Sequence, residues 1–449
     1  MVVASHPLTP SPPHHFTRIA TEIFSVALQA VDPYAAVKGR ISHILSIYKN
    51  EGLNKLFLVS FGKAAFLMTK AVADTAPDLI TRGVVITKYG HVMGGHLPAC
   101  IEVCEAGHPI PDKSGMEATC RAIEILKGAD EKTLVLCLIS GGGSALLVAP
   151  KENVSLDDKQ AVTDLLLKAG ASINELNTVR KHISGVKGGR LAELAYPARV
   201  ISFTLSDVIG DKLDVIASGP TSPDSTTYQM ALEVVKKYRL TDRLPKTVMD
   251  ILCGGVDGRI ADTPKEGDSI FAHVENIIVG SNRRAALAAE ERAKKLGFNT
   301  TILSTELQGE AHDVARWLAK KALEAKKSLE RKGARKLCLI SGGETTVTVR
   351  GDGKGGRNTE LALAFALEID GIQGTTLLSA GTDGTDGPTD AAGAIVNGDT
   401  IQKARSLSLD PVAYLKNNDS YNFFSKIGEF LITGPTGTNV MDLQIILIE

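Results

Sequence analysis

The segment 336–360 combines groups that bind anions with the predicted start of a helix. It reads KLCLISGGETTVTVRGDGKGGRNTE, in which an apolar run ends at Ser341 and a loop with four glycines leads to Arg357 and Asn358. Backbone amides and a cation delivered to a helix N-terminus are a common anion site in α/β proteins. Because a guanidinium group can hold a carboxylate or a phosphate through two hydrogen bonds, we expect Arg357 to bind such a group.

The sequence CLISGG occurs twice, at 137–142 and at 338–343, and each copy ends an apolar run typical of a strand. Two similar turns predict two α/β units, and both turns could offer backbone amides and hydroxyl groups to an anion. Lys63 follows another apolar run, in the turn Gly62-Lys63. Since α/β proteins bind ligands at the carboxyl ends of their strands, this position favours a function for Lys63 over an ordinary surface role.

Basic residues recur at short intervals in the segment 173–194, INELNTVRKHISGVKGGRLAEL. The spacing gathers Asn177, Arg180, Lys181 and Lys187 on one side of a predicted helix. A solvated basic face is the ordinary interpretation of such a run. The flanking glycines and the lack of interleaved acidic residues make an anion-facing role an equal alternative.

Two aspartates stand just after predicted strands, Asp207 in one half of the chain and Asp383 in the other. Their placement at strand ends makes them candidates for contact with a ligand. Asp383, the nearest acid to its strand, is the best candidate for a general base or a magnesium contact. Asp386 and Asp390 follow in the same Gly- and Thr-rich segment, and we interpret them as turn-forming residues.

Other site types lack their signatures in this sequence. There is no Walker A pattern, no zinc-ligand spacing and no esterase elbow. Gly351, Gly353 and Gly356 formally spell the dinucleotide fingerprint G-x-G-x-x-G. The next predicted strand, 375–379, ends without the acid that would hold a ribose, so a glycine-rich phosphate loop is the preferred interpretation.

The bulk composition excludes several classes of function. Lys plus Arg (50) nearly balance Asp plus Glu (51), and aromatic residues make up 5% of the chain, so we expect no nucleic-acid or membrane partner. The six cysteines contain no C-x-x-C pair, which favours a reducing, cytoplasmic setting. The proline-rich start lacks the apolar core of a signal peptide, and the longest apolar region is interrupted by glycines, so a soluble protein is expected.

Strand-turn-helix patterns run along most of the 449 residues. They predict an α/β fold of two Rossmann-like, three-layer α/β/α domains with an interdomain cleft. We expect a disordered extension at 1–13, a first domain at 14–253, a Gly- and Asp-rich linker at 254–270 and a second domain at 271–449. The second domain is predicted to open with a strand at 275–280, and its last strands could pack back on the first domain.

Seven segments of the chain, taken in order, resemble the class II glycerate kinases. They read SGGGSALL, LNTVRKHISGVKGGRLA, SDVIGD with ASGPTSPD, SGGETTVTVRGDGKGGRNTELALA, SAGTDGTDGPTDAAGA and LITGPTGTNVMDL. The similarity extends from about Phe16 to the C-terminus, and so many long motifs argue against a chance match. The resemblance implies a glycerate-kinase N-terminal domain followed by a MOFRL domain, with the active site between them.

The resemblance also implies a reaction, transfer of the γ-phosphoryl group of ATP to D-glycerate with Mg²⁺, usually giving 2-phosphoglycerate. The family's catalytic lysine, arginine and aspartate correspond to Lys63, Arg357 and Asp383. Lys63 and Arg357 would neutralise the moving phosphoryl group or orient the glycerate carboxylate. Asp383 would accept the hydroxyl proton or help to hold Mg²⁺, for which Asp207 is a second candidate. The residues expected to bind glycerate or the nucleotide are Gly141, Gly142, Gly143, Ser144, Asn177, Arg180, Lys181, Lys187, Asp207, Ser341, Gly342, Gly343, Glu344 and Asn358.

Two other functions stay open at this point. A hydroxypyruvate reductase that uses NADH or NADPH is kept open by the formal G-x-G-x-x-G and by the reductase label that similar sequences have received; the missing ribose acid counts against it. A non-catalytic regulator that binds sugar phosphates would use the same glycine turns, but it would not need Lys63 and Asp383 together. We expect the protein to be a monomer or a homodimer.

Overall fold

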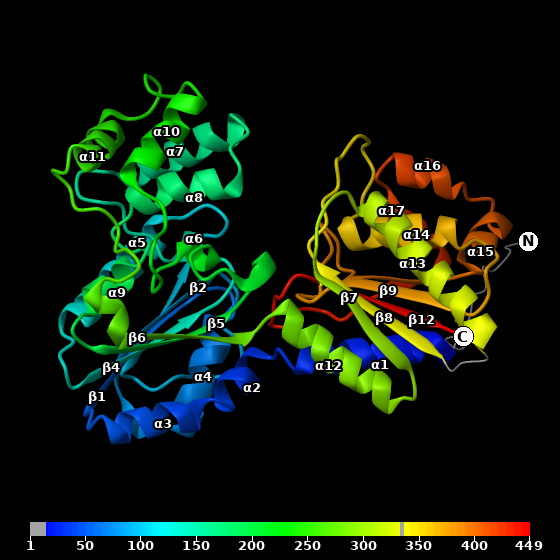
Figure 1. Ribbon diagram of the computed structural model, residues 1–449, viewed down its shortest axis with the longest axis horizontal. Coiled ribbons are helices and arrows are strands. Elements are labelled where there is room, and N and C mark those ends of the chain that lie inside the picture. Colours follow the sequence, from blue (N-terminus) through cyan, green and yellow to red (C-terminus); the bar gives the residue numbers. More distant parts are fainter. Residues whose placement is uncertain (1–14, 333–335) are drawn as a thin grey trace, which may run out of the picture. The chain divides into compact units, whose positions relative to one another are not determined.

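The computed structural model describes residues 15–332 and 336–449, which form two compact units. The first unit comprises 31–281 and 437–439, and the second comprises 15–30, 282–436 and 440–449. Each unit is a twisted six-stranded sheet with helices packed on it (Figure 1). The prediction of an α/β fold with two sheets is confirmed. The predicted extension, 1–13, lies outside the described residues.

The first unit is built on a parallel sheet. Its strands are β1 (Lys55–Phe61), β2 (Ile80–Lys88), β3 (Ile101–Ala106), β4 (Thr133–Ile139), β5 (Arg199–Leu205) and β6 (Val274–Gly280). They lie in the order β3-β2-β1-β4-β5-β6 and all run in the same direction. The central strand β4 is buried at every position, as its unbroken apolar run requires. The order reverses between β1 and β4, and open α/β sheets bind ligands at such a reversal.

Helices cover both faces of this sheet, and a further group of helices has a core of its own. The helices on the sheet include α4 (Ala65–Thr75) with α2 (Pro33–Lys38) on one face and α5 (Lys113–Lys127) with α9 (Arg190–Ala195) on the other. The further group, in green in Figure 1, consists of α7 (Leu156–Lys168), α8 (Ile173–His182), α10 (Tyr228–Lys237) and α11 (Lys246–Val256). α7 and α8 each begin with a serine capping box, at Ser155 and Ser172, which satisfies first-turn amides.

The second unit is built on a mixed sheet. Its strands are β7 (Asn299–Leu307), β8 (Leu337–Gly343), β9 (Thr375–Gly381), β10 (Gly393–Asn397), β11 (Phe430–Leu431) and β12 (Asp442–Ile448), in the order β11-β10-β9-β12-β8-β7. β12 is buried throughout and runs antiparallel between β8 and β9. Its first residue, Asp442, pairs with Gly343 on one side and Gly381 on the other. β12 therefore brings a carboxylate to the carboxyl ends of β8 and β9.

Two pairs of helices enclose the mixed sheet. α1 (His15–Gln29) and α12 (Asn282–Lys295) contact one face, and α13 (Ala311–Lys332) with α14 (Arg357–Glu368) covers the other (Figure 1). α1 fits its place because its apolar residues recur at helical spacing and are buried, among them Ile19, Ile23 and Phe24. Within the described parts of the chain, no helix is both long and apolar enough to cross a lipid bilayer.

The structure divides the chain at different points from those predicted. The strand expected to open the second domain, β6, pairs with β5 as the sixth strand of the first sheet. α1, expected in the first domain, packs on the second sheet. The expected linker, 254–270, contains the end of α11 and belongs to the first unit. The last strands join the second sheet, and only 437–439 group with the first unit. Local periodicity is enough to predict a helix or a strand. The sheet to which that element belongs depends on contacts with residues distant in sequence.

We expect Ile446→Ala to lower the free energy of unfolding by about 2–5 kcal/mol, because it leaves a cavity in the middle of a strand paired on both sides. Ile446 is fully buried, whereas Ile432 is 62% exposed. Urea unfolding followed by circular dichroism measures both variants. Ile432→Ala, the matched control, should stay within about 0.5 kcal/mol of the wild type. Equal effects of the two substitutions would contradict the assignment of β12 to the core.

Candidate functional site

Lys63 lies where the turns after β1 and β4 meet. Its backbone amide donates a hydrogen bond to the carbonyl of Gly141 (2.9 Å), and the amide of Ala64 donates to the hydroxyl of Ser140 (3.0 Å). The Lys63 side chain is half-buried, and its Cγ lies 3.3 Å from the position that a Cβ on Gly142 would take. Lys63 and the first glycine-rich turn therefore come together where the strand order reverses.

Asp207 reaches the same turn from the adjacent strand end. It follows β5, which pairs with β4, and its Oδ2 lies 2.3 Å from the position that a Cβ on Gly141 would take. Only glycine leaves room for the carboxylate there. Lys63, Gly141 and Asp207 thus occupy three neighbouring strand ends, as expected from their positions after apolar runs.

His108 is a neighbour of Lys63 that sequence reasoning missed. Its Cδ2 lies 2.9 Å from the Cβ position of Gly142. Burial, and then the positive charges of Lys63 and Lys88, lower the pKa of His108 to about 4, so its ring is neutral near pH 7. On the other side, Nδ1 of His91 lies 3.2 Å from the carbonyl oxygen of Lys63. The one available signal was that His108 closely follows a predicted strand.

Two of the predicted basic residues converge on the carbonyl oxygen of Ser144. Nη2 of Arg180 donates to it at 3.3 Å and Nζ of Lys187 at 2.9 Å. α8 ends before Lys187, which reaches this point from the following turn. The hydroxyl of Ser144 lies 2.8 Å from that of Ser218, which donates to the Oδ1 of Asn177 (3.3 Å). These contacts link α8 to the turn after β4.

Ser218 was also missed, and its backbone is unusual. The three residues 217–219 have φ values of 50°, 65° and 62°, and the first two are not glycine. Such a conformation costs of the order of 1–3 kcal/mol per non-glycine residue and persists where its surroundings enforce it. The result is a turn that holds Ser218 against Ser144.

Lys181 does not join the other basic residues. Its Nζ lies 3.1 Å from Asp224 and 3.7 Å from Asp214, and its side chain is 3% exposed. Burial alone would raise the pKa of Asp224, but Lys181 and the hydrogen bonds from Thr226 outweigh burial and lower it. In this structure the charge of Lys181 is therefore matched by acids of its own unit.

Arg357 forms the central ion pair of the second unit. Its Nε and Nη2 donate to the two carboxylate oxygens of Asp442, at 2.6 and 3.0 Å, and its Nη1 lies 2.8 Å from Glu344. Asp442 is fully buried, and burial raises its pKa to about 6 although the contacts with Arg357 act in the opposite direction. Asp442 was missed; the signal available was an acid at the start of an otherwise apolar strand.

Asp383 lies next to this ion pair. Its Oδ1 is 3.2 Å, and the Oδ1 of Asp442 is 3.6 Å, from the position that a Cβ on Gly381 would take. Asp383 accepts hydrogen bonds from the amide and the hydroxyl of Thr385, both 3.1 Å long. The hydroxyl of Thr382 donates to the carbonyl of Met441 at 2.6 Å and ties the start of β12 to the same turn. Arg357 and Asp383 are thus brought to neighbouring strand ends.

The glycines of the loop 351–356 serve packing within the chain, which corrects the interpretation of this loop as a phosphate site. A Cβ on any of these glycines would lie 2.3–2.4 Å from an atom of residues 417–420 or of Asp386. The carboxylate of Asp386 accepts hydrogen bonds from the amides of Asn358 (2.9 Å) and Thr359 (2.8 Å). An aspartate of the same unit therefore takes the first-turn amides of α14, and Asn358 is buried beneath it.

The two copies of CLISGG fold differently. The first ends its strand at Ile139 and turns, whereas Ser341, Gly342 and Gly343 continue β8 and pair with β12. The amide of Glu344 donates to the carbonyl of Leu307 at 2.9 Å. Pairing with the antiparallel strand β12 keeps the second copy extended. The residues around the second copy do not predict this pairing, because β12 is distant in sequence. Of the four residues 341–344 that were expected to bind ligand, Glu344 is the one whose side chain forms an ion pair with Arg357.

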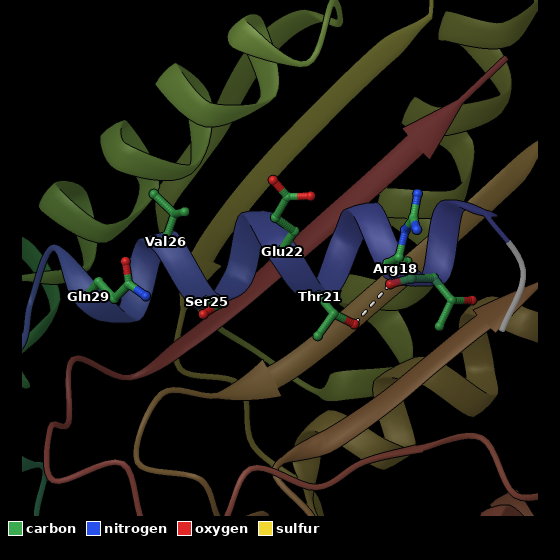
Figure 2. A pocket seen from close by; sticks show the side chains of 7 residues that line it. Arg18, Thr21, Glu22, Ser25, Val26 and Gln29 are labelled. Atoms are coloured by element: carbon green, nitrogen blue, oxygen red, sulfur yellow. Dashed lines mark hydrogen bonds between the residues drawn. The ribbon is translucent and has the colours of Figure 1, made fainter.

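A shallow hollow of about 600 Å³ runs along α1. The residues found to line it all belong to that helix: Thr17, Arg18, Thr21, Glu22, Ser25, Val26 and Gln29. Figure 2 shows their side chains spread along the helix, with Thr21 hydrogen-bonded to the carbonyl of Thr17. Glu22 is paired with Arg292 of α12. Groups from several elements do not converge here, so we assign no chemistry to this hollow.

Metal binding would have to rest on few protein ligands. Across residues 15–332 and 336–449, no three His, Cys, Asp or Glu side chains are grouped so that they could hold a metal ion. Mg²⁺ commonly needs only one or two carboxylates, since substrate phosphates and water complete its shell. Asp207 and Asp383 each present one carboxylate at a strand end, which suits that mode of binding.

Comparison with known proteins adds a relationship over nearly the whole chain. Residues 19–253 match a domain of unknown function (DUF4147), and residues 337–442 match the MOFRL family. The D-glycerate 2-kinase of Thermotoga maritima is 45% identical, and the match covers 97% of this chain and 99% of the relative. A protein of Agrobacterium vitis that carries the provisional name hydroxypyruvate reductase is 42% identical, over 88% of this chain and all of the relative. The crystal structure of glycerate kinase from Thermotoga maritima matches with a TM-score of 0.89 and 46% identity, over 97% of this chain and 100% of that chain.

We expect Lys181→Met to lower the free energy of unfolding by about 3–5 kcal/mol at pH 7, because it leaves the buried carboxylate of Asp224 without its cation. The pKa of Asp224 is lowered in the folded state, so its stabilising effect is present above the ordinary carboxyl pKa and is lost as the pH falls. The difference from the wild type should therefore shrink in acid. Urea unfolding at several pH values measures this.

The matched control for this prediction is Lys236→Met, which changes an exposed lysine of α10. It should change stability by no more than about 0.5 kcal/mol. A Lys181→Met variant as stable as this control would show that the ion pair has no structural role.

Proposed function

The chain belongs to the glycerate 2-kinase family, and from this premise we propose that it transfers the γ-phosphoryl group of ATP to D-glycerate, giving 2-phosphoglycerate and ADP. The observation that carries the proposal is that each unit holds a cation at the carboxyl ends of its central strands: Lys63 in one and Arg357 in the other. Phosphoryl transfer depends mainly on positioning and on neutralising charge, which fixed cations supply.

In the first unit, Lys63 is proposed as a catalytic residue. Its ammonium group would neutralise charge on the moving phosphoryl group or on the glycerate carboxylate. The neutral ring of His108 beside it leaves the lysine as the positive charge at the turn after β1. Gly141, Gly142, Gly143 and Ser144 are proposed to contact the ligand through the same turn, because α/β proteins use this position for ligands.

In the second unit, Arg357 and Asp383 are proposed as catalytic residues. Two of the guanidinium nitrogens are held by Asp442, so the orientation of Arg357 is set before a ligand binds, which lowers the cost of organising the transition state. Asp383 would accept the proton of the glycerate hydroxyl as the oxygen attacks phosphorus. A base of this kind must lie within hydrogen-bond reach of the hydroxyl.

ATP and Mg²⁺ are the proposed cofactors. When bound, Mg²⁺ would offset negative charge on the phosphates. Asp383 in the second unit, or Asp207 in the first, is the carboxylate proposed to contact it. All six cysteines are free thiols, which supports a reducing, cytoplasmic compartment, and a monomer or a homodimer is proposed.

A hydroxypyruvate reductase is the competing function, since one relative carries that provisional name. It would need a dinucleotide site. The formal G-x-G-x-x-G lies in the loop 351–356, whose glycines pack against residues 417–420, whereas a dinucleotide fingerprint directly follows a strand. The turn after β1 reads FGKAA and lacks the fingerprint. These observations favour the kinase.

We predict that Lys63→Ala and Asp383→Ala each lower kcat by at least about 100-fold, as expected when a group that acts on the transition state is removed. The measurement is ADP release from ATP, D-glycerate and Mg²⁺ in a coupled assay. Circular dichroism and thermal unfolding verify that each variant is folded. Exposed Lys236→Met provides the control and should retain wild-type turnover.

Near-normal turnover in both alanine variants would overturn the assigned roles. A parallel reaction with hydroxypyruvate and NADH or NADPH tests the competing function. Oxidation of the nicotinamide without any ADP release from the glycerate reaction would replace the kinase with the reductase.

We further predict that the kcat of the wild type falls as the pH drops through about 6, because Asp442, whose pKa burial raises to about 6, then takes up a proton and Arg357 loses the ion pair that binds two of its nitrogens. Asp442→Asn should lower kcat about tenfold or more at pH 8 and should remove this acid limb. The measurement is kcat against pH for both proteins.

Protonation of Asp442 lowers activity but does not lower the stability of the fold. A loss of kcat caused by this protonation can therefore be distinguished from a loss caused by acid unfolding. A carboxyl group whose folded pKa is raised stabilises the folded state at low pH, and this contribution is lost as the pH rises through the folded pKa. Asp442 therefore does not promote unfolding between pH 4 and 6. An acid limb in Asp442→Asn identical to that of the wild type would contradict the role of Asp442 as a positioning residue.

A further inference from the structure

Three cations of the first unit come together without an acidic partner; two are buried, and the third, Arg180, is half-buried. They are Lys159 of α7, Arg180 of α8 and Lys187 of the turn before α9. Lys159 is 2% exposed and Lys187 is fully buried. Within the described ranges, none of the three lies within 4 Å of a carboxylate, in contrast to Lys181, which is paired with Asp224. We call these three residues the cation cluster.

The cation cluster adjoins the turn that follows β4. Arg180 and Lys187 both donate to the carbonyl oxygen of Ser144, at 3.3 and 2.9 Å. Further donors of the cluster are unused, since neither Nζ of Lys159 nor Nε of Arg180 has a hydrogen-bond partner in the described part of the chain. Guanidinium and ammonium groups have five and three N–H donors, so one shared carbonyl leaves most of their donors unsatisfied.

An arrangement of this kind is costly unless something compensates for it. Burying a charge without a partner costs several kcal/mol, and proteins avoid it unless the charge is paired. Burial, and then the neighbouring charges of Arg180 and Lys159, lower the pKa of Lys187 well below its ordinary value. Burial and Arg180 likewise lower the pKa of Lys159 to about 7. The charge of Arg180 acts on both lysines and that of Lys159 acts on Lys187, so the three groups form one electrostatic unit.

We propose that Lys159, Arg180 and Lys187 form a binding subsite for one compact oxyanion, the carboxylate of a small hydroxy acid or a phosphoryl group. The choice of ligand rests on the proposed function, because substrate and product both carry such groups. Arg180 and Lys187 were expected from sequence to bind ligand; the new element is Lys159 of α7, the helix that packs against α8. An oxyanion has enough acceptors to take the unused donors of all three cations.

The position of Lys159 on α7 explains why the sequence alone does not indicate a binding role for it. It stands three residues before Val162 and seven before Leu166, on the buried stripe of the helix. A lysine on such a stripe is usually interpreted as one whose charged end reaches solvent. Here the ammonium group itself is buried.

The test measures binding without turnover. Isothermal titration calorimetry of the full chain, without nucleotide and in a buffer free of phosphate, uses inorganic phosphate in one arm and D-glycerate in the other. We compare the wild type with Lys159→Met, which keeps the length of the side chain and removes its charge, and with Lys168→Met. Lys168 lies on the same helix, 72% exposed and paired with Asp164, and is the matched control.

A loss of affinity of about tenfold or more in Lys159→Met, with Lys168→Met unchanged, supports the subsite. Loss in the phosphate arm identifies a phosphoryl group as the ligand, and loss in the glycerate arm identifies a carboxylate. Equal affinity of Lys159→Met and the wild type in both arms, or no binding by the wild type in either arm, overturns the proposal. Neither arm requires phosphoryl transfer. The binding result can therefore be interpreted even if the protein shows no kinase activity.

Thermal unfolding of the same proteins without ligand gives a second readout. If Lys159 serves a ligand, its burial in the free protein, either charged or at the cost of giving up its proton, is destabilising, and Lys159→Met should unfold at the same temperature as the wild type or higher. A clearly lower unfolding temperature for Lys159→Met would show that the lysine stabilises the fold by itself, and would overturn the proposal. Lys159→Gln, a polar variant of similar size, is measured beside it and should follow Lys159→Met.

Discussion

The ion pair between Arg357 and Asp442 is the constraint on which the second unit depends. A fully buried carboxylate is stable only beside a cation or several hydrogen-bond donors, so Asp442 requires Arg357 at this point. Asp442 begins β12 and Arg357 begins α14, so the ion pair joins the start of that strand to the start of that helix. It also leaves Arg357 with one nitrogen toward Glu344 and a fixed orientation beside Asp383. Stability and the proposed chemistry therefore rest on the same contact.

The first unit achieves a similar result by topology. Parallel strands bring their carboxyl ends to one edge of the sheet, and the reversal of strand order brings Lys63 against the turn 140–144. Asp207 enters from the next strand because Gly141 leaves room for it. Behind that turn the basic residues separate into two roles. Lys181 is matched by acids, whereas Arg180 and Lys187 are left facing Ser144.

Residues that follow a strand directly could be predicted from the sequence, and residues placed by distant partners could not. Lys63, Asp207 and Asp383 lie at strand ends, and a local pattern is enough to find a strand end. Asp442 and Lys159 were missed because their partners are distant in sequence: Arg357 for Asp442, and Arg180 and Lys187 for Lys159. No window of neighbouring residues contains these partners. The loop 351–356 was misread because glycine admits either a ligand or another stretch of chain, and here residues 417–420 fill the space. The same limit explains why the segments that form β6 and α1 were assigned to the wrong domains.

The most direct test of the central claim is ³¹P NMR of the wild-type protein with ATP, D-glycerate and Mg²⁺. We predict that ADP and 2-phosphoglycerate appear in equal amounts, because the chain belongs to the glycerate 2-kinase family and Lys63 and Arg357 are cations of the kind that phosphoryl transfer needs. A phosphoglycerate signal at the 3-position would contradict the proposed regiochemistry. Unchanged ATP and glycerate in a folded, metal-supplemented sample would contradict the kinase itself.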